Sequence, residues 1–274
     1  MAQKKTIRMM FLGDLVGEPG LALFEKWVPR LKEKHKIDAV VVNGENTGKN
    51  GKGITAEIVQ RLKDAGCSVI TSGNHIWANK KIYDFISQSD VLLRPANYPS
   101  VCPGKGFALV NLNDAYVGVI CVQGRVFMHE DIECPFRTVD SLISMLKTKT
   151  NIIFVEFHAE ATSEKHAMRH FLDGKVTGLF GTHTHVQTSD EMILPSGTAY
   201  MTDLGFAGAQ HSALGIDQKI ILNRFLSQMP AFFKVEKKGP MVLNGVWVEV
   251  DVETGNTLKI ERINIVDNEI HNFF

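Results

Sequence analysis

Cysteine is scarce in this sequence, with four residues among 274, and no two of them form a CxxC pair. The four stand far apart, at Cys67, Cys102, Cys121 and Cys134. A chain of this length can bury a core large enough to fold without disulfides. We therefore expect four reduced thiols and a cytoplasmic protein.

Long apolar runs are also missing, and none reaches the length of a membrane span. Lys4 and Lys5 precede the apolar stretch at residues 7–12, as at the start of a signal peptide. That stretch is too short, and Gly13-Asp14 ends it without a cleavage-like site. The sequence predicts no association with a membrane.

Neither sign of charge is in excess, because 30 Lys and Arg residues balance 30 Asp and Glu residues. Proteins that coat nucleic acid by neutralising phosphates are normally basic. The balance therefore argues against bulk nucleic-acid binding. The content of 44% hydrophobic and 22% charged residues is that of an ordinary globular protein.

Linkers rich in Pro, Gly or Ser, low-complexity tracts and fixed-period repeats are absent, so one domain over residues 1–274 is the simplest account. In the first half, apolar runs of strand length alternate with amphipathic stretches, which predicts βαβ units and a largely parallel inner sheet. A second sheet packed on the first gives the expected fold class, α/β, as a layered α/β/β/α sandwich with mixed sheets and flanking helices. The expected strands are residues 6–12, 39–42, 68–71, 107–112, 115–122, 152–157, 176–181, 241–252 and 257–266, and the expected helices are residues 21–34, 55–65, 139–146 and 164–172.

Polar side chains follow five of these strands, where the carboxyl ends of parallel strands form a ligand-binding edge. Carboxylate, amide and imidazole groups together suit Mn, Fe or Zn better than Ca. They are too many for one tetrahedral ion, whereas two ions that share a bridging carboxylate would use them all. The candidate metal ligands are Asp14, Glu45, Asn46, Asn74, His158, His183 and His185.

Each candidate also has an ordinary structural explanation. Asp14 could cap a helix, Asn46 could lie in a turn, and His158 could be a hydrogen-bonded core residue. His183 and His185 are a stronger signal, because imidazoles two apart on an extended segment project from the same side. The joint occurrence at five strand ends favours the metal site, since each ordinary explanation would have to hold separately.

A glycine-rich basic loop, residues 48–53, follows Glu45-Asn46 and contains Lys49 and Lys52. It is either a plain turn or a loop that faces phosphate. It is not a P-loop, because the GKS/T ending is missing.

Taken together, these motifs resemble those of the calcineurin-like metallophosphoesterases, whose pattern is D-x-H, GD, GNH, a lone His and GHxH. Val16 stands where the usual first-motif histidine would be, and Glu45 replaces the usual bridging aspartate. Both departures are typical of one bacterial subfamily, the YmdB-type cyclic-nucleotide phosphodiesterases. The similar stretches, between residue 7 and about residue 266, are NGENTGKNGKGIT, TSGNHIW, FHAEATSEK, GTHTHVQTSDE and TDLGFAG.

The resemblance implies a metallophosphoesterase-type sandwich with two metal ions, iron or manganese. It implies that Asp14, Glu45, Asn46 and His185 hold one ion, that Glu45, Asn74, His158 and His183 hold the other, and that Glu45 bridges them. His75 would act on the leaving oxygen instead of binding metal. The implied substrates are 2′,3′-cyclic nucleotides, and such proteins tend to form homo-oligomers.

From these residues we expect phosphodiester hydrolysis by a metal-activated water with His75 as general acid. Two alternatives stay open. One is a metal-dependent phosphomonoesterase, such as a protein phosphatase. The other is a non-enzymatic regulator that binds cyclic nucleotides or an RNA-processing protein partner. Four aromatic side chains could stack on a base, although core packing is the favoured explanation, namely Trp77, Tyr98, Phe127 and Phe136.

Overall fold

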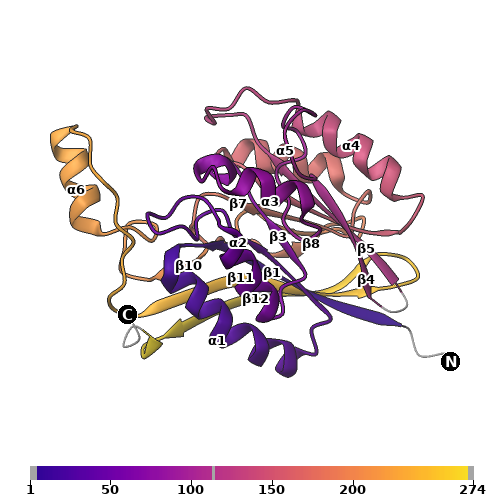
Figure 1. Ribbon diagram of the computed structural model, residues 1–274. Coiled ribbons are helices and arrows are strands. Elements are labelled where there is room, and N and C mark those ends of the chain that lie inside the picture. The colour runs from indigo at the N-terminus through magenta and orange to yellow at the C-terminus, as the bar shows by residue number, and fades with distance from the viewer. Residues whose placement is uncertain (1–4, 113–114, 271–274) are drawn as a thin grey trace.

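Two six-stranded mixed sheets lie face to face, with helices on both outer faces, in the computed structural model, which describes residues 5–112 and 115–270 (Figure 1). This confirms the expected α/β/β/α sandwich. Within the described residues, no helix is both long enough and apolar enough to cross a bilayer.

The first sheet is built around β1, which is parallel to β2 and β10 and antiparallel to β11. Met10 and Leu12 face the outer helices while Met9 and Phe11 face the second sheet. Both faces of β1 are therefore buried, which explains its unbroken apolar sequence. In spatial order the strands are β12 (Thr257–Asp267), β11 (Met241–Asp251), β10 (Phe206–Ala209), β1 (Thr6–Leu15), β2 (Ala39–Asn43) and β3 (Val69–Thr71).

The second sheet has a parallel centre and antiparallel edges. Its order is β4 (Phe107–Leu112), β5 (Ala115–Gln123), β6 (Ile152–His158), β7 (Gly178–Thr182), β9 (Ala199–Met201) and β8 (Met192–Ile193). The pair β4–β5 is the expected hairpin, with Leu112 opposite Ala115. Its expected turn at residues 113–114 lies outside the described part of the chain.

Helices cover the two outer faces in separate groups. The first group packs on the first sheet through side chains such as Phe24, Leu62 and Ile82. The second packs on the second sheet through Val139 and Met168. The first group consists of α1 (Gly17–His35), α2 (Ala56–Asp64), the 3₁₀ turn η1 (Ile76–Ala78) and α3 (Ile82–Gln88). The second group consists of α4 (Pro135–Leu146) and α5 (Thr162–Leu172). Helix α6 (Gln218–Ser227) belongs to neither group.

Between the sheets lies a continuous apolar layer. The ring of Phe11 on β1 is 4.7 Å from the rings of both Phe154 on β6 and Phe180 on β7. This packing fixes the two sheets against each other. It also sets the carboxyl ends of β1 and β2 opposite those of β6 and β7, where the polar strand-end residues stand.

The sequence pattern did not predict α3, β8, β9, β10 and α6. Of these, β10 bears most on the site, because it lies between β11 and the carboxyl end of β1, with Phe206 opposite Asp14. It is only four residues long, and two of its residues are Gly208 and Ala209, so it carries little periodic signal.

Candidate metal centre

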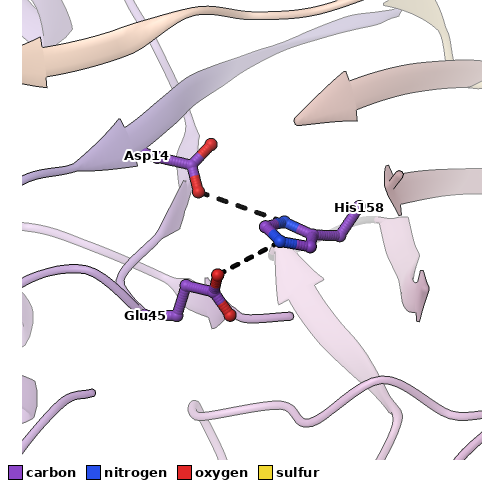
Figure 2. A group of neighbouring side chains, drawn as sticks. All are labelled: Asp14, Glu45 and His158. Atoms are coloured by element: carbon purple, nitrogen blue, oxygen red, sulfur yellow. Dashed lines mark ion pairs between the residues drawn. The ribbon is translucent and has the colours of Figure 1, made fainter. Parts of the chain in front are cut away.

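Three of the predicted ligands converge between the sheets. Asp14 lies near the end of β1, Glu45 lies just beyond β2, and His158 is the last residue of β6. All three are buried, and one ligand atom of each lies within 4.8 Å of the others. Figure 2 shows the imidazole of His158 between the two carboxylates.

Further donor atoms surround Nε2 of His158. It lies 3.1 Å from Oε1 of Glu45, 3.1 Å from Oδ1 of Asn74 and 3.0 Å from Nδ1 of His183. Two donors at right angles on a single ion, each about 2.1 Å from it, are about 3.0 Å apart. The four residues that the resemblance assigns to one ion thus have the spacing of ligands to a shared cation.

The remaining predicted ligands face the same space. Nε2 of His185 lies 3.8 Å from Oδ1 of Asp14. Among the described residues, Oδ1 of Asp14 and Oδ1 of Asn46 are two of the few buried side-chain oxygens without a hydrogen-bond partner. The amide nitrogen of Asn46 donates to the Gly51 carbonyl at 2.9 Å, which leaves its oxygen free. A buried acceptor without a partner destabilises the folded state, and a bound cation would supply that partner. These two oxygens therefore fit a cation site.

Each of the three imidazoles is oriented by a polar group on its outer side. Nε2 of His183 lies 3.0 Å from the Glu160 carboxylate, and Nδ1 of His185 lies 3.1 Å from the Leu214 carbonyl. Nδ1 of His158 lies 3.0 Å from the hydroxyl of Thr182, which itself donates to Glu156, and 3.3 Å from the amide nitrogen of Asn43. In His183 and His185 the acceptor on the outer side leaves the inner nitrogen with its lone pair, as in histidines that bind metal.

The electrostatics agree with this orientation. Burial lowers the pKa of His158 to about 4 and that of His183 to about 3, so both rings are neutral near pH 7. Burial also raises the pKa of Asp14. Neutral imidazoles beside buried carboxyl groups form a donor set that fits divalent metal ions.

The backbone beyond β7 corrects one part of the sequence reasoning. His183 and His185 do not lie on an extended segment, because their φ angles are 97° and 60° and the chain bends there. Left-handed φ values are unusual for histidine and store strain. The two imidazoles reach the centre through this bend and not through the alternation of a strand.

Close packing also shapes the centre at Gly73, just before Asn74. A β-carbon at this position would lie 2.0 Å from the ring of His158. Only glycine therefore lets the loop after β3 approach the imidazole. The backbone N–H groups of Gly73 and His75 both donate to Oε2 of Glu45, the second at 2.9 Å.

Behind the ligands lies a buried carboxyl group, Glu156, on the same face of β6 as His158. Its Oε1 accepts from the Asn43 amide at 2.7 Å and from the Thr182 hydroxyl at 2.8 Å. Burial raises the pKa of Glu156 from 4.5 to about 8. Glu156 therefore supports His158 through Thr182, and the neutral carboxyl form is favoured in the folded state.

We expect Glu156→Gln to change how stability depends on pH. A raised pKa stabilises the native state fully below about pH 4.5, and this stabilisation is lost as the pH rises towards 8. Glutamine keeps the acceptor oxygen and does not ionise. The melting temperature of the chelator-treated variant, relative to wild type, should therefore rise between pH 4.5 and 8. A difference independent of pH would contradict the shifted ionisation.

A buried ion pair holds the bend that carries the two histidines. Nζ of Lys165 lies 2.7 Å from Oδ2 of Asp203 and donates to the Thr182 carbonyl at 2.8 Å. The same Asp203 oxygen accepts from the hydroxyl of Thr184 at 2.8 Å. Both charged side chains are about 1% exposed. The pair thus ties α5 and the segment before β10 to the end of β7.

Breaking this pair is expected to destabilise the protein strongly. Lys165→Met leaves the Asp203 carboxylate buried without its partner, which costs about 3–5 kcal/mol. The matched control is Lys105→Met, which removes an exposed partner of Asp90 at 2.8 Å and should change stability little, because water screens this pair. Urea unfolding measures both. Equal losses in the two variants would contradict the role of the buried pair.

Several supporting residues escaped the sequence reasoning although signals for them exist. Glu156 interrupts an apolar run that predicts a fully buried strand. Lys165 lies on the apolar stripe of α5, with Ala161, Met168 and Leu172. A charged residue in either place has to be paired. Asp203 offers no such local signal, because it lies in a loop. Val16, where the usual histidine is missing, packs against Phe206 and carries no ligand atom.

Comparison with known proteins agrees with this arrangement. The family described as YmdB-like protein matches residues 10–263. A 2′,3′-cyclic-nucleotide 2′-phosphodiesterase of Bacillus subtilis (strain 168) is 44% identical over 268 residues, which are 98% of this chain and 100% of that protein. The chain belongs to the YmdB-like family.

Two solved structures of similar sequence show the same fold. A phosphatase from Mycoplasma pneumoniae has a TM-score of 0.91 and 35% identity, covering 99% of this chain and 98% of that one. A hypothetical protein from Thermus thermophilus has a TM-score of 0.88 and 36% identity, covering 95% of this chain and 100% of that one. The resemblance to the YmdB-like family seen in the sequence is thereby confirmed.

Proposed function

We propose that the protein is a metal-dependent phosphodiesterase that hydrolyses 2′,3′-cyclic nucleotides with two metal ions. The observation that carries the proposal is the convergence of Glu45, Asn74 and His183 on Nε2 of His158, beside the unpaired oxygen of Asp14. The Bacillus subtilis relative, named for this activity, supports the choice of substrate.

Two groups of residues would hold the ions, and both are those that the resemblance implies. Glu45, Asn74, His158 and His183 would hold one, and Asp14, Asn46 and His185 would hold the other together with Glu45. Fe or Mn fits this mixture of oxygen and imidazole donors. When bound, the ions would lower the pKa of water and offset negative charge on the phosphoryl group.

His75 is the residue we assign to the leaving oxygen. Its Nδ1 lies 3.4 Å from the amide nitrogen of Asn74. Burial lowers the pKa of His75, which keeps the ring neutral near pH 7. The ring lines the cavity beside Glu45 and His183. Because the lowered pKa makes the imidazolium a stronger acid, the protonated ring can transfer a proton to the departing ribose oxygen and return to its neutral form.

His75 and Lys52 line the same cavity beside the candidate ligands. The backbone N–H of His75 is anchored on Glu45, which fixes the imidazole relative to the ligand cluster. Lys52 lines the same cavity and supplies a positive charge for a phosphate. This position supports the phosphate-facing loop, one of the two alternatives that the sequence left open.

Product analysis tests the proposal. Chelator-treated protein should cleave neither adenosine 2′,3′-cyclic monophosphate nor its 3′,5′ isomer. Added Mn²⁺ or Fe²⁺ should restore cleavage of the 2′,3′ isomer, with adenosine 3′-monophosphate as product. Preference for p-nitrophenyl phosphate over the cyclic diester would instead indicate a phosphomonoesterase. Binding without turnover in metal-loaded protein would indicate a regulator. Homo-oligomer formation stays a prediction of the resemblance, and an RNA-processing partner stays part of the regulator alternative.

A further inference from the structure

A cavity of about 500 Å³ adjoins the candidate metal centre, within the size range of small-molecule sites. Its lining is divided between two kinds of residue. One side is polar and contains His75 and the ligand residues Glu45, Asn46, His183 and His185. The other side is apolar and is formed by Leu214, Ile216, Ile221, Phe225 and Phe233.

The apolar side comes almost entirely from one excursion of the chain, residues 215–236, which we call the arm. Its two ends are tied by hydrogen bonds, from Glu236 N to the Gly215 carbonyl and from Asp217 N to the Lys234 carbonyl, both 2.9 Å long. Between these ties lies α6, which stands apart from both sheets in Figure 1, and none of its residues is buried. The arm therefore adds little to the core, and its apolar side chains require another explanation.

Two aromatic rings of the arm line the cavity. Phe225 is 70% exposed, and Phe233 is half-buried with the guanidinium of Arg224 5.0 Å from its ring centre. A cavity that has charged ligands at one side and flat apolar rings at the other fits a nucleotide, whose phosphate and base are at opposite ends. We propose that the arm is the nucleobase-binding wall, with Phe225 and Phe233 stacking on the base. This inference rests on the proposed function.

The chemistry of the wall also sets its selectivity. The arm residues that line the cavity carry no side-chain hydrogen-bond donor or acceptor. Stacking without hydrogen bonds accepts every base, because each has a π-face. The wall therefore accepts both purines and pyrimidines. Its affinity for a base increases mainly with the area of the base that stacks on it. The four aromatic residues considered from the sequence do not line this cavity, namely Trp77, Tyr98, Phe127 and Phe136.

The test compares two cyclic diesters, adenosine 2′,3′-cyclic monophosphate and glycerol 1,2-cyclic phosphate, which has the same five-membered ring and no base. In Phe225→Ala the ratio of kcat/KM for the first over the second should fall about tenfold, through KM. Phe225→Trp should restore the ratio. The matched control is Phe232→Ala, which removes a ring that is 95% exposed on the same arm and outside the cavity, and it should keep the wild-type ratio.

A binding measurement separates this inference from the proposed function. Calorimetry with adenosine 3′-monophosphate and chelator-treated protein should show a Kd about tenfold weaker in Phe225→Ala and unchanged in Phe232→Ala. If wild type cleaves the cyclic diesters while Phe225→Ala leaves the ratio and the Kd unchanged, the wall is refuted and the proposed function stands. If wild type cleaves neither diester, the proposed function fails, and the Kd values alone decide whether the arm binds the base.

Discussion

Replacing Glu45 with glutamine is expected to lower turnover of a 2′,3′-cyclic nucleotide by about 10³-fold and to remove both metal ions together. Oε1 of Glu45 belongs to the group around His158, while the carboxylate also lies within 4.8 Å of the ligand atom of Asp14. A neutral amide in this place cannot offset the charge of two cations. Elemental analysis of purified protein and steady-state kinetics measure the two effects.

A graded control comes from Glu160, which contacts only the outer nitrogen of His183 at 3.0 Å. Glu160→Gln should lower the affinity for one metal ion by about 10- to 100-fold and leave the other ion bound. Full occupancy of both sites in the Glu45 variant would show that this carboxylate does not bridge. An equal loss in both variants would show that the cluster is disrupted as a whole.

Removing the imidazole of His75 is expected to lower kcat by about 10²- to 10⁴-fold while metal content stays near that of wild type. In the proposed function His75 would give a proton to the leaving oxygen and no ligand atom to the cluster around His158. His170→Ala is the matched control, because His170 is an exposed histidine on α5. It should keep wild-type kcat.

The leaving group provides the sharper readout for His75. Hydrolysis of bis(p-nitrophenyl) phosphate releases a phenolate that needs no proton, so the deficit of His75→Ala should shrink strongly with this substrate. A deficit of the same size with both substrates would overturn the assignment of the general acid. Loss of both metals from the variant would indicate instead that His75 belongs to the metal site.

Hydrophobic periodicity and the polar residues at strand ends predicted the inner strands and the candidate site residues. The apolar runs that became β1, β2, β6 and β7 are buried on both faces, so their sequences show strands without any tertiary information. The polar residues after them are conspicuous because they end apolar runs. For the same reason the seven candidate ligands and His75 could be named in advance, although their roles stay predictions that the experiments above test.

The sequence by itself therefore determined the order of the inner elements along the chain and the identity of the candidate donors. Both follow from local patterns of apolar and polar residues. Only the tertiary structure decided how the donors meet. It showed the bend at His183 and His185, the room that Gly73 leaves for His158, and the support of Thr182 by Glu156. It also placed the arm beside the cavity. These features depend on contacts between residues far apart in the chain, such as Lys165 with Asp203, and no local pattern encodes such distances.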